Sequence, residues 1–344
     1  MATAPVSGRT LLRSPSVGET PGAASMVLLK TGVSQRGGQR ATLAEALAGH
    51  GNALNFVRLV LASAVILAHT WPLGGFGTSP WENISDVAVN GFFAISGFLI
   101  AGSRMRSGMA PFLWRRALRI FPAFWVCLAA VALVFSPVAA RLADDHWSAS
   151  SALRYVVTNA FLWIQQRGIA ETLTGVPYPE AWNGSLWTLM YEFGAYVAAG
   201  FILSGPLARP RKVPVLLASL VGVLALELLA RGPLAITTNL YLNGLRLAGF
   251  FLAGMVLWAV ADRLPATPLL GVPSVLAIPA LVLVGDVAYW IFGAIPTAYA
   301  VLWLGAVLPT RVGSVNDISY GLYIYAFPVQ QLLAVLHVPE RLGF

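Results

Sequence analysis

The sequence predicts an all-α protein of the polytopic membrane class, a bundle of transmembrane helices, and two observations carry this prediction. Hydrophobic residues make up 57% of the 344 residues and charged residues only 10%, far from the composition of soluble domains. The apolar residues also gather in runs of about 20, enough for an α-helix to cross a bilayer. Nine runs reach or approach this length: 54–72, 84–102, 118–136, 184–205, 213–231, 239–262, 268–284, 286–308 and 317–336.

The segment 1–51 differs from the rest of the chain. It is rich in Gly, Ser, Ala, Thr and Arg and has no apolar run long enough for a signal-peptide core. We expect it to be a disordered cytoplasmic leader before a transmembrane domain over 52–344. Cytoplasmic loops carry an excess of Lys and Arg, so the basic link between the second and third runs places the N-terminus in the cytoplasm. That link contains Arg104, Arg106, Arg115, Arg116 and Arg119.

A tenth, shorter run covers 152–166, and basic residues decide how to interpret it. If it crossed the membrane, Arg209, Arg211 and Lys212 would lie outside, against the positive-inside rule. As a partial or re-entrant helix it leaves them inside. The sequence therefore predicts nine spans plus one partial helix, with the C-terminus outside.

Composition also excludes several kinds of site. The net charge of +8 falls mostly in short segments between apolar runs, which does not indicate a nucleic-acid partner. Cys127 is the only cysteine, so a disulfide framework and a cysteine-based metal site are excluded, and we interpret it as core filling. The sequence has no phosphate-binding glycine loop, metal-spaced cluster or serine-nucleophile elbow. We expect no metal and no permanently bound cofactor.

The first run, NALNFVRLVLASAVILAHTW over 52–71, carries two charge-capable residues, Arg58 and His69. Eleven residues of α-helix turn through about 1100° and rise about 16 Å, so both side chains leave one face about half a bilayer apart. Ionisable residues at membrane depth usually face a bundle interior or a wet cavity. His69 is a candidate general base, or a histidine satisfied by a neighbour. Arg58 either anchors an anionic ligand from the cytoplasm or extends to the headgroups.

The third run begins with a group of cations. Arg116 and Arg119 share a helical face beside Arg115, and three guanidinium groups at a helix entrance can clamp phosphate. A simple positive-inside signal also explains the charge, though not the shared face.

Glu192 lies inside the run 184–205, on a stripe with Ser185, Thr188 and Tyr196 at helical spacing. A carboxylate in an apolar span needs a partner. Glu192 is a candidate to orient His69, to pair with an arginine, to steady a substrate hydroxyl, or to form a purely structural ion pair.

Two further features are a face of small residues in the second run and a group of tyrosines in the last run. Asn90, Ala94, Gly97 and Ala101 form a small face that lets another helix approach closely, and Asn90 alone among them can reach a substrate. The last run is unusually rich in tyrosine, which also fits an aromatic belt: Tyr320, Tyr323 and Tyr325.

Taken together, these stretches resemble the integral-membrane acyltransferase 3 family, whose members include glycan O-acetyltransferases. The spacing of Arg58 and His69 is similar to that family's first-helix motif. Four further stretches resemble its motifs in order: GFFAISGFLI at 91–100, RRALRIFPAF at 115–124, SLWTLMYEF at 185–193 and ISYGLYIYAFPV at 318–329.

The resemblance implies a bacterial inner-membrane enzyme that moves an acyl group, commonly acetyl, from cytoplasmic acyl-CoA as co-substrate to a hydroxyl of an extracytoplasmic or lipid-linked glycan. It is most similar to the exopolysaccharide- and O-antigen-modifying members. By this similarity His69 would be the catalytic base, and Arg58, Arg116 and Arg119 would help to hold the donor. From the residue patterns we add Glu192 as a second catalytic candidate and Arg115 as a donor-binding candidate. We also expect possible substrate or oxyanion contacts from Asn90, Trp187 and Tyr320.

Two departures and one alternative accompany this resemblance. Many relatives have a histidine where this chain reads Tyr325–Ala326. The family's usual ten spans exceed the nine counted here, so we expect the chain to lack the last helix. The alternative function is a transporter that moves a proton or small anion past the same intramembrane charges, although no inverted pair of broken helices is visible.

Overall fold

The computed structural model describes residues 41–49, 51–80, 82–205, 210–310, 312–313 and 317–342. Most of the expected leader, together with Arg209, lies outside these ranges. The part of the leader within them, 41–49, forms the short helix α1 (Leu43–Ala46). A capping box between Thr42 and Glu45 starts this helix, and Leu43 is fully buried. This segment is therefore packed against the transmembrane domain.

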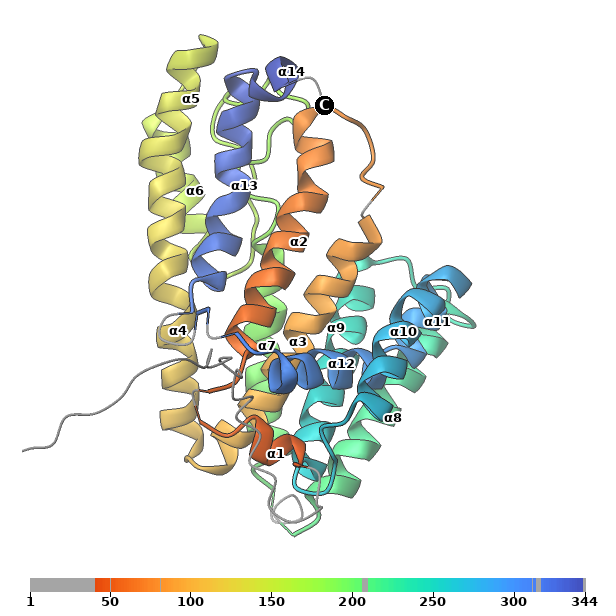
Figure 1. The fold of residues 1–344 in the computed structure, drawn as a ribbon. Helices are drawn as coiled ribbons and strands as arrows, with labels where there is room; N and C mark the ends of the chain where they lie inside the picture. Colours follow the sequence, from red (N-terminus) through yellow and green to blue (C-terminus); the bar gives the residue numbers. More distant parts are fainter. Residues whose placement is uncertain are drawn as a thin grey trace, which may run out of the picture. The chain divides into compact units, whose positions relative to one another are not determined.

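Helices are the only regular secondary structure in the described residues, which contain no β-strand beyond an isolated bridge between Thr42 and Pro265. Figure 1 shows α2 and α13 side by side, and α12 lies across the bundle, where it contacts α2, α3 and α9. The remaining elements, in order, are α2 (Leu54–Gly74), α3 (Glu82–Met105), α4 (Met109–Ala130), the π-turn η1 (Val131–Phe135), α5 (Ser136–Ala143), α6 (Ala149–Asn159), α7 (Trp187–Ile202), α8 (Lys212–Arg231), α9 (Asn239–Val260), α10 (Pro268–Val284), α11 (Asp286–Phe292), α12 (Ala294–Val307), α13 (Ser319–Val335) and α14 (Val338–Leu342).

The polytopic helical class is confirmed, but the count of nine spans is not. Five helices in the described part are long and apolar enough to cross a membrane: 54–74, 83–105, 109–143, 212–231 and 239–260. Three others that correspond to predicted spans are shorter, with 16 residues in α7 and 17 each in α10 and α13. Helices of that length fall at or below the lower limit for a full crossing.

The predicted span 286–308 is a pair of helices, α11 and α12, bent by 68° at Gly293. Pro296 lies in the first turn of α12 and has no N–H to donate to the preceding helix, which explains why a continuous helix does not form. The absence of a side chain at Gly293 also matters, because a Cβ there would collide with the Tyr289 carbonyl. With this pair as one span, the total rises to six.

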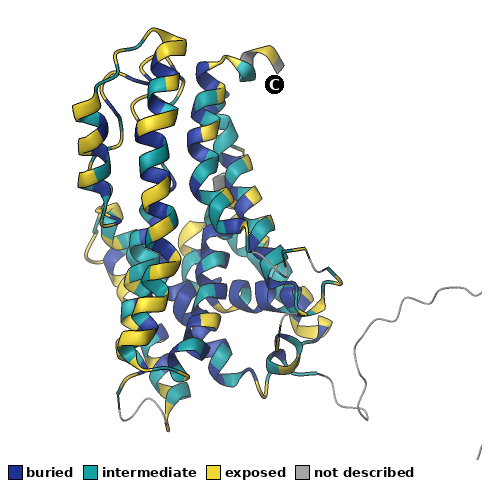
Figure 2. Ribbon diagram, turned by 90° about the vertical axis from the view of Figure 1, so that its left-hand side faces the viewer, coloured by how far each residue is buried: buried dark blue, intermediate teal, exposed yellow. Residues whose placement is uncertain are grey.

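Exposed apolar side chains cover the long helix formed by α4, η1 and α5. Leu133 is 65% exposed, and Trp114, Val126 and Val134 are also exposed. Figure 2 shows such exposed faces on outer helices, around a buried interior. A large apolar surface of this kind is suited to lipid rather than to water.

The small face of α3 packs against α9, as the sequence predicts. A Cβ on Gly97 would collide with the carbonyl of Phe251, and one on Gly254 would collide with the carbonyl of Ala94. The two backbones therefore touch through paired glycines. This contact fixes α3, which contributes residues to both cavities described below.

The predicted partial helix over 152–166 is present as α6, with only 11 residues. The chain then follows an irregular path to α7. Asn159 donates to the Gln166 carbonyl at 2.7 Å, and Trp182 Nε1 donates to Thr172 Oγ1 at 2.9 Å. Buried side chains thus satisfy the backbone of this loop, which brings Tyr178 close to α2.

Candidate functional site: two cavities along α2

Arg58 and His69 line two different cavities along α2. The Arg58 cavity has a volume of about 50 Å³, whereas the His69 cavity has about 690 Å³. Charged side chains from three elements line the smaller one: Arg58, Arg119 and Glu192. Helices α2, α3, α7 and α13, together with the loop before α7, form the larger one.

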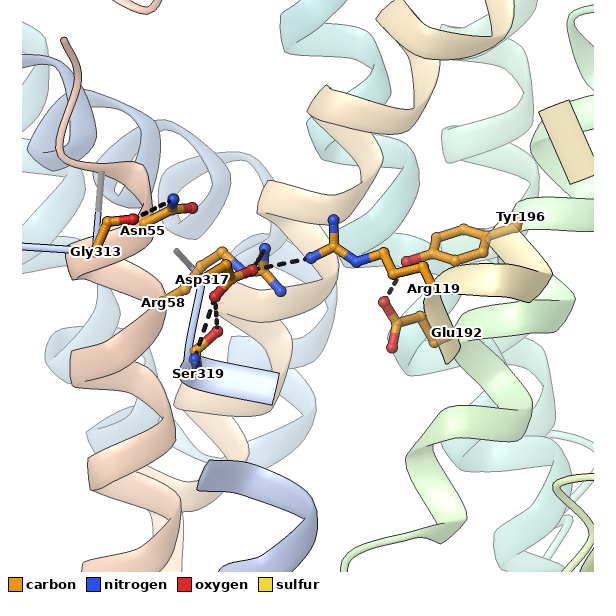
Figure 3. A network of polar contacts seen from close by, with 8 residues as sticks. All are labelled: Asn55, Arg58, Arg119, Glu192, Tyr196, Gly313, Asp317 and Ser319. Carbon is orange, nitrogen blue, oxygen red and sulfur yellow. Dashed lines mark hydrogen bonds and ion pairs between the residues drawn. The ribbon is translucent and has the colours of Figure 1, made fainter. Parts of the chain in front are cut away.

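Arg58 is paired with Asp317, in the segment before α13. Its Nη1 lies 2.5 Å from Asp317 Oδ2, and Arg119 Nη2 lies 3.0 Å from the same oxygen (Figure 3). The other carboxylate oxygen accepts from Ser319, at 2.5 Å from Oγ and 3.2 Å from the backbone N. A single carboxylate therefore joins α2, α4 and α13 in one ionic cluster.

The Asp317 carboxylate is stabilised in its charged form. Burial by itself would raise the pKa of this carboxyl, but the charge of Arg58, the Ser319 hydrogen bonds and the charge of Arg119 hold the pKa below its usual value. Two guanidinium groups share this carboxylate, which leaves cationic charge on one side of the cavity.

Glu192 lies on the opposite side of the Arg58 cavity. Tyr196, one turn further along α7, donates a hydrogen bond to its Oε1 (Figure 3). Arg116 lies within electrostatic reach of both. Arg115 points elsewhere: it is exposed and is absent from the cavity lining. The structure thus brings Arg58, Arg119 and Glu192 together with Arg116 beside them, and it places Glu192 in the Arg58 cavity rather than beside His69.

The His69 imidazole lines the larger cavity and packs edge-on against Phe327, with ring centroids 5.7 Å apart. In the part of the chain that the structure describes, neither ring nitrogen has a hydrogen-bond partner. Within the described residues, the structure therefore gives no support to the alternative of a histidine satisfied by a neighbouring carbonyl or hydroxyl. Gln330 fixes this end of α2 by donating to the Ile66 carbonyl at 3.1 Å and to Thr70 Oγ1 at 2.9 Å.

A thin wall separates the two cavities, because Val89, Thr188 and Tyr323 line both of them. The Tyr323 hydroxyl donates to the Ser185 carbonyl at 3.0 Å and lies 2.9 Å from Thr188 Oγ1. The Tyr323 ring also packs edge-on against Phe92. The stripe predicted on α7 thus contributes to this wall, which we call the Tyr323 wall.

The remaining candidates fall on both sides of the wall. Trp187 lines the His69 cavity, and Tyr320 lines the Arg58 cavity while its hydroxyl donates to the Ile120 carbonyl at 3.0 Å. Asn90 is fully buried and lines neither cavity. Its side-chain amide has no hydrogen-bond partner among the described residues.

Sequence reasoning missed three charged residues: Asp317, Asp86 and Arg246. Asp317 lies two residues before the first residue of α13, just before the N-cap Ile318, and its Oδ1 accepts from the backbone N of Ser319. Arg246 is an isolated cation in an apolar run, the same signal that singled out Arg58. Its partner Asp86 lies at 2.7 Å and lines the His69 cavity.

Known proteins provide independent evidence. A family model described as "Acyltransferase domain" matches residues 52–338. The chain is 30% identical over 296 residues to an O-acetyl transferase of Shigella phage Sf6, with 82% of this chain and 85% of that protein aligned. It is 31% identical over 172 residues to nodulation protein 10 of Rhizobium leguminosarum bv. viciae, with 45% of each chain aligned. No solved structure matches. Since the family model covers most of the chain and one relative aligns over nearly its whole length, the protein belongs to the acyltransferase 3 family.

Proposed function

We propose that the protein transfers an acyl group, most simply acetyl, from acyl-CoA to a hydroxyl of a glycan, with His69 as the general base. One observation carries the proposal: a cationic cavity and an imidazole cavity lie along one helix, separated by the Tyr323 wall. Such an arrangement suits a reaction whose two substrates approach from opposite sides of a membrane.

The cationic side suits the donor. Arg119 is 38% exposed and Arg58 only 9%, so Arg119 is available to phosphate while Arg58 stays paired with Asp317. Arg116 adds a third guanidinium nearby. A volume of about 50 Å³ holds only a few waters, so the nucleotide stays outside and only the thin thioester end enters. Guanidinium groups bind phosphate well because their donors match its oxygens.

The imidazole side suits the acceptor. A volume of about 690 Å³ lies within the usual range for small-molecule sites and leaves room for a sugar unit. Tyr178 and Trp187 supply aromatic surface in this cavity. Among the described residues no partner occupies the lone pair of His69, which leaves the imidazole able to accept a proton from an incoming hydroxyl.

The reaction is proposed to occur at the Tyr323 wall. The acceptor oxygen attacks the thioester carbonyl carbon as His69 removes its proton, the C–S bond breaks, and the proton passes to the departing thiolate. The Tyr323 hydroxyl donates its single proton to the Ser185 carbonyl in this structure, and in the proposed reaction it turns to donate that proton to the oxyanion formed on the thioester carbonyl. Transfer is direct, because the buried Cys127 already donates to the Ile324 carbonyl at 3.3 Å and lines neither cavity.

The proposal also fixes an orientation. The arginine end of α2 faces the cytoplasm, where acyl-CoA is made, and the His69 end faces outward. In a bacterium this places the protein in the inner membrane with a cytoplasmic N-terminus. Glu192 then balances the donor-side cations and has no direct contact with His69.

The test compares His69→Gln with His146→Gln, a matched change at an exposed histidine that lines neither cavity. Membranes receive radiolabelled acetyl-CoA and alkali-deacetylated envelope polysaccharide from the host. We expect His69→Gln to lower label transfer by about 100-fold or more, the usual contribution of a general base, while His146→Gln transfers normally. Normal transfer by His69→Gln would remove His69 from the mechanism. Wild-type membranes that move protons or anions but label no glycan would instead favour a transporter.

A further inference from the structure

A second ion pair, between α3 and α9, reaches the His69 cavity. Asp86, near the start of α3, lies 2.7 Å through Oδ2 from Nη1 of Arg246 on α9. The two partners differ greatly in exposure, since the Arg246 side chain is 4% exposed and the Asp86 side chain 45%. The cation is thus enclosed by the bundle, while the carboxylate lies at the cavity.

Arg246 is held within a group of aromatic and charged side chains. Its guanidinium lies 5.7 Å from the Trp290 ring centroid, and Arg231 lies 3.9 Å from the same centroid. Glu227 is fully buried, bonds to Arg231 at 3.2 Å and adds negative charge near Arg246. This group fixes the guanidinium in place within a membrane-spanning helix. A charged side chain there costs free energy, so it usually marks a functional site.

The packing of α3 against α9 does not by itself explain the Asp86–Arg246 ion pair. These helices already touch through Gly97 and Gly254, whose backbones meet carbonyls of the partner helix. A pair that served only this contact would bury both charges, whereas here the carboxylate remains open to the cavity. Arg246 thus fixes the position of the Asp86 carboxylate, which faces the cavity and can contact a bound molecule.

The chemistry around Asp86 suits a molecule rich in hydroxyl groups. A carboxylate only accepts hydrogen bonds, and Oδ2 of Asp86 is engaged by Arg246. No described residue donates to Oδ1, which can therefore accept from a donor in the cavity. Trp187 and Tyr178 line the same space and present apolar ring surface, as a sugar ring with hydroxyl edges and C–H faces requires.

We infer that Asp86 binds the acceptor by accepting a hydrogen bond from a sugar hydroxyl, and that Arg246 is the positioning residue that aims this carboxylate. The inference rests on the proposed acyl transfer and adds a residue for the acceptor side. Asp86 holds the sugar while His69, on the facing helix, removes the proton from the hydroxyl that reacts.

Asp86→Glu tests this without breaking the ion pair, because the charge is kept and only the reach of the side chain changes. The purified protein is assayed with radiolabelled acetyl-CoA and alkali-deacetylated envelope polysaccharide, and KM is measured for each. We expect the KM for polysaccharide to rise by about tenfold, as for a misplaced hydrogen bond to a charged group, with the KM for acetyl-CoA and the thermal unfolding midpoint unchanged. Asp86→Asn is expected to raise the polysaccharide KM at least as much.

The matched control is Asp262→Asn, an exposed carboxylate just after the other end of α9. It should behave as wild type in both KM values. A purely structural pair would leave the polysaccharide KM of Asp86→Glu unchanged and would show only a lowered unfolding midpoint in Asp86→Asn, which would overturn the inference. If Asp86→Asn does not fold, Asp86→Glu decides alone. Failure of the wild-type protein to label the polysaccharide would refute the proposed function itself.

Discussion

At the scale of single residues, Asp317 is the acid that makes a buried arginine tolerable. Arg58 lies in the second turn of a membrane-spanning helix, and an unpaired guanidinium there would be costly. Asp317 pairs with it and with Arg119, and Ser319 occupies the remaining carboxylate oxygen. Arg58 is thus held toward its cavity while Arg119, more exposed, stays available to a phosphate.

This cluster makes the free energy of unfolding depend on pH in the acidic range. The folded pKa of Asp317 lies below its unfolded value of about 4, so its contribution is complete above that pH and is lost as the pH falls through the folded pKa. We expect the unfolding free energy in detergent to change little between about pH 7 and 5 and to fall below about pH 4. Asp317→Asn should lower the unfolding free energy by about 2 kcal/mol at neutral pH. It should also reduce the fall of this free energy below about pH 4, which we call the acid limb of the curve.

Asp144→Asn is the matched control for this measurement. Asp144 is exposed at the end of α5 with a φ of 56°, a conformation that asparagine also tolerates. Its unfolding curve should follow that of the wild type at every pH. An Asp317→Asn variant with the same acid limb as the wild type would show that other carboxylates control the transition.

At the scale of secondary-structure elements, the wall between the cavities is formed where α3, α7 and α13 meet. Tyr323 on α13 crosses this meeting point and hydrogen-bonds to the Ser185 carbonyl and to Thr188. The proposed reaction brings a thioester from one side and a hydroxyl from the other to this wall, whose two hydroxyl groups belong to Tyr323 and Thr188.

Tyr323→Phe tests this position because it removes the hydroxyl and keeps the ring. We expect kcat to fall by about 100-fold, as for loss of an oxyanion donor, with both KM values unchanged. Tyr325→Phe is the control, since Tyr325 lies on the same helix but lines neither cavity. A kcat for Tyr323→Phe equal to that of Tyr325→Phe would exclude an oxyanion role.

At the scale of the whole molecule, local patterns predicted much of the site and none of its long-range pairings. The apolar run around Arg58 and His69 predicted one helix with two functional groups on one face, and the structure places both in cavities along that helix. Asp317, 259 residues away from Arg58, had no local signal to link them. The break at Gly293 and the short α7, α10 and α13 changed the span count, because tertiary contacts determine where helices end.

Helix lengths also bear on topology. With 11 residues, α6 extends about 16 Å, roughly half of the hydrocarbon core, so it cannot carry the chain across. The chain between α5 and α7 therefore returns to the side from which it came. The proposed orientation also requires the 16-residue α7 to complete a crossing, which would place Arg211, before α8, on the same side as the basic link between α3 and α4, as the positive-inside rule requires.

Single cysteines test this arrangement directly. Cys127→Ala removes the one native thiol, and Ser150→Cys and Arg211→Cys place new ones at exposed positions on either side of α7. In intact cells a membrane-impermeant maleimide should label Ser150→Cys at once and Arg211→Cys only after permeabilisation. Labelling of both in intact cells would mean either that the 144–186 segment completes a crossing or that the 16-residue α7 does not. Protection of Ser150→Cys in intact cells, by contrast, would place the end of α5 and the His69 end of α2 on the cytoplasmic side, and the arginine cluster and the imidazole would then no longer face the donor and acceptor sides that the proposed reaction needs.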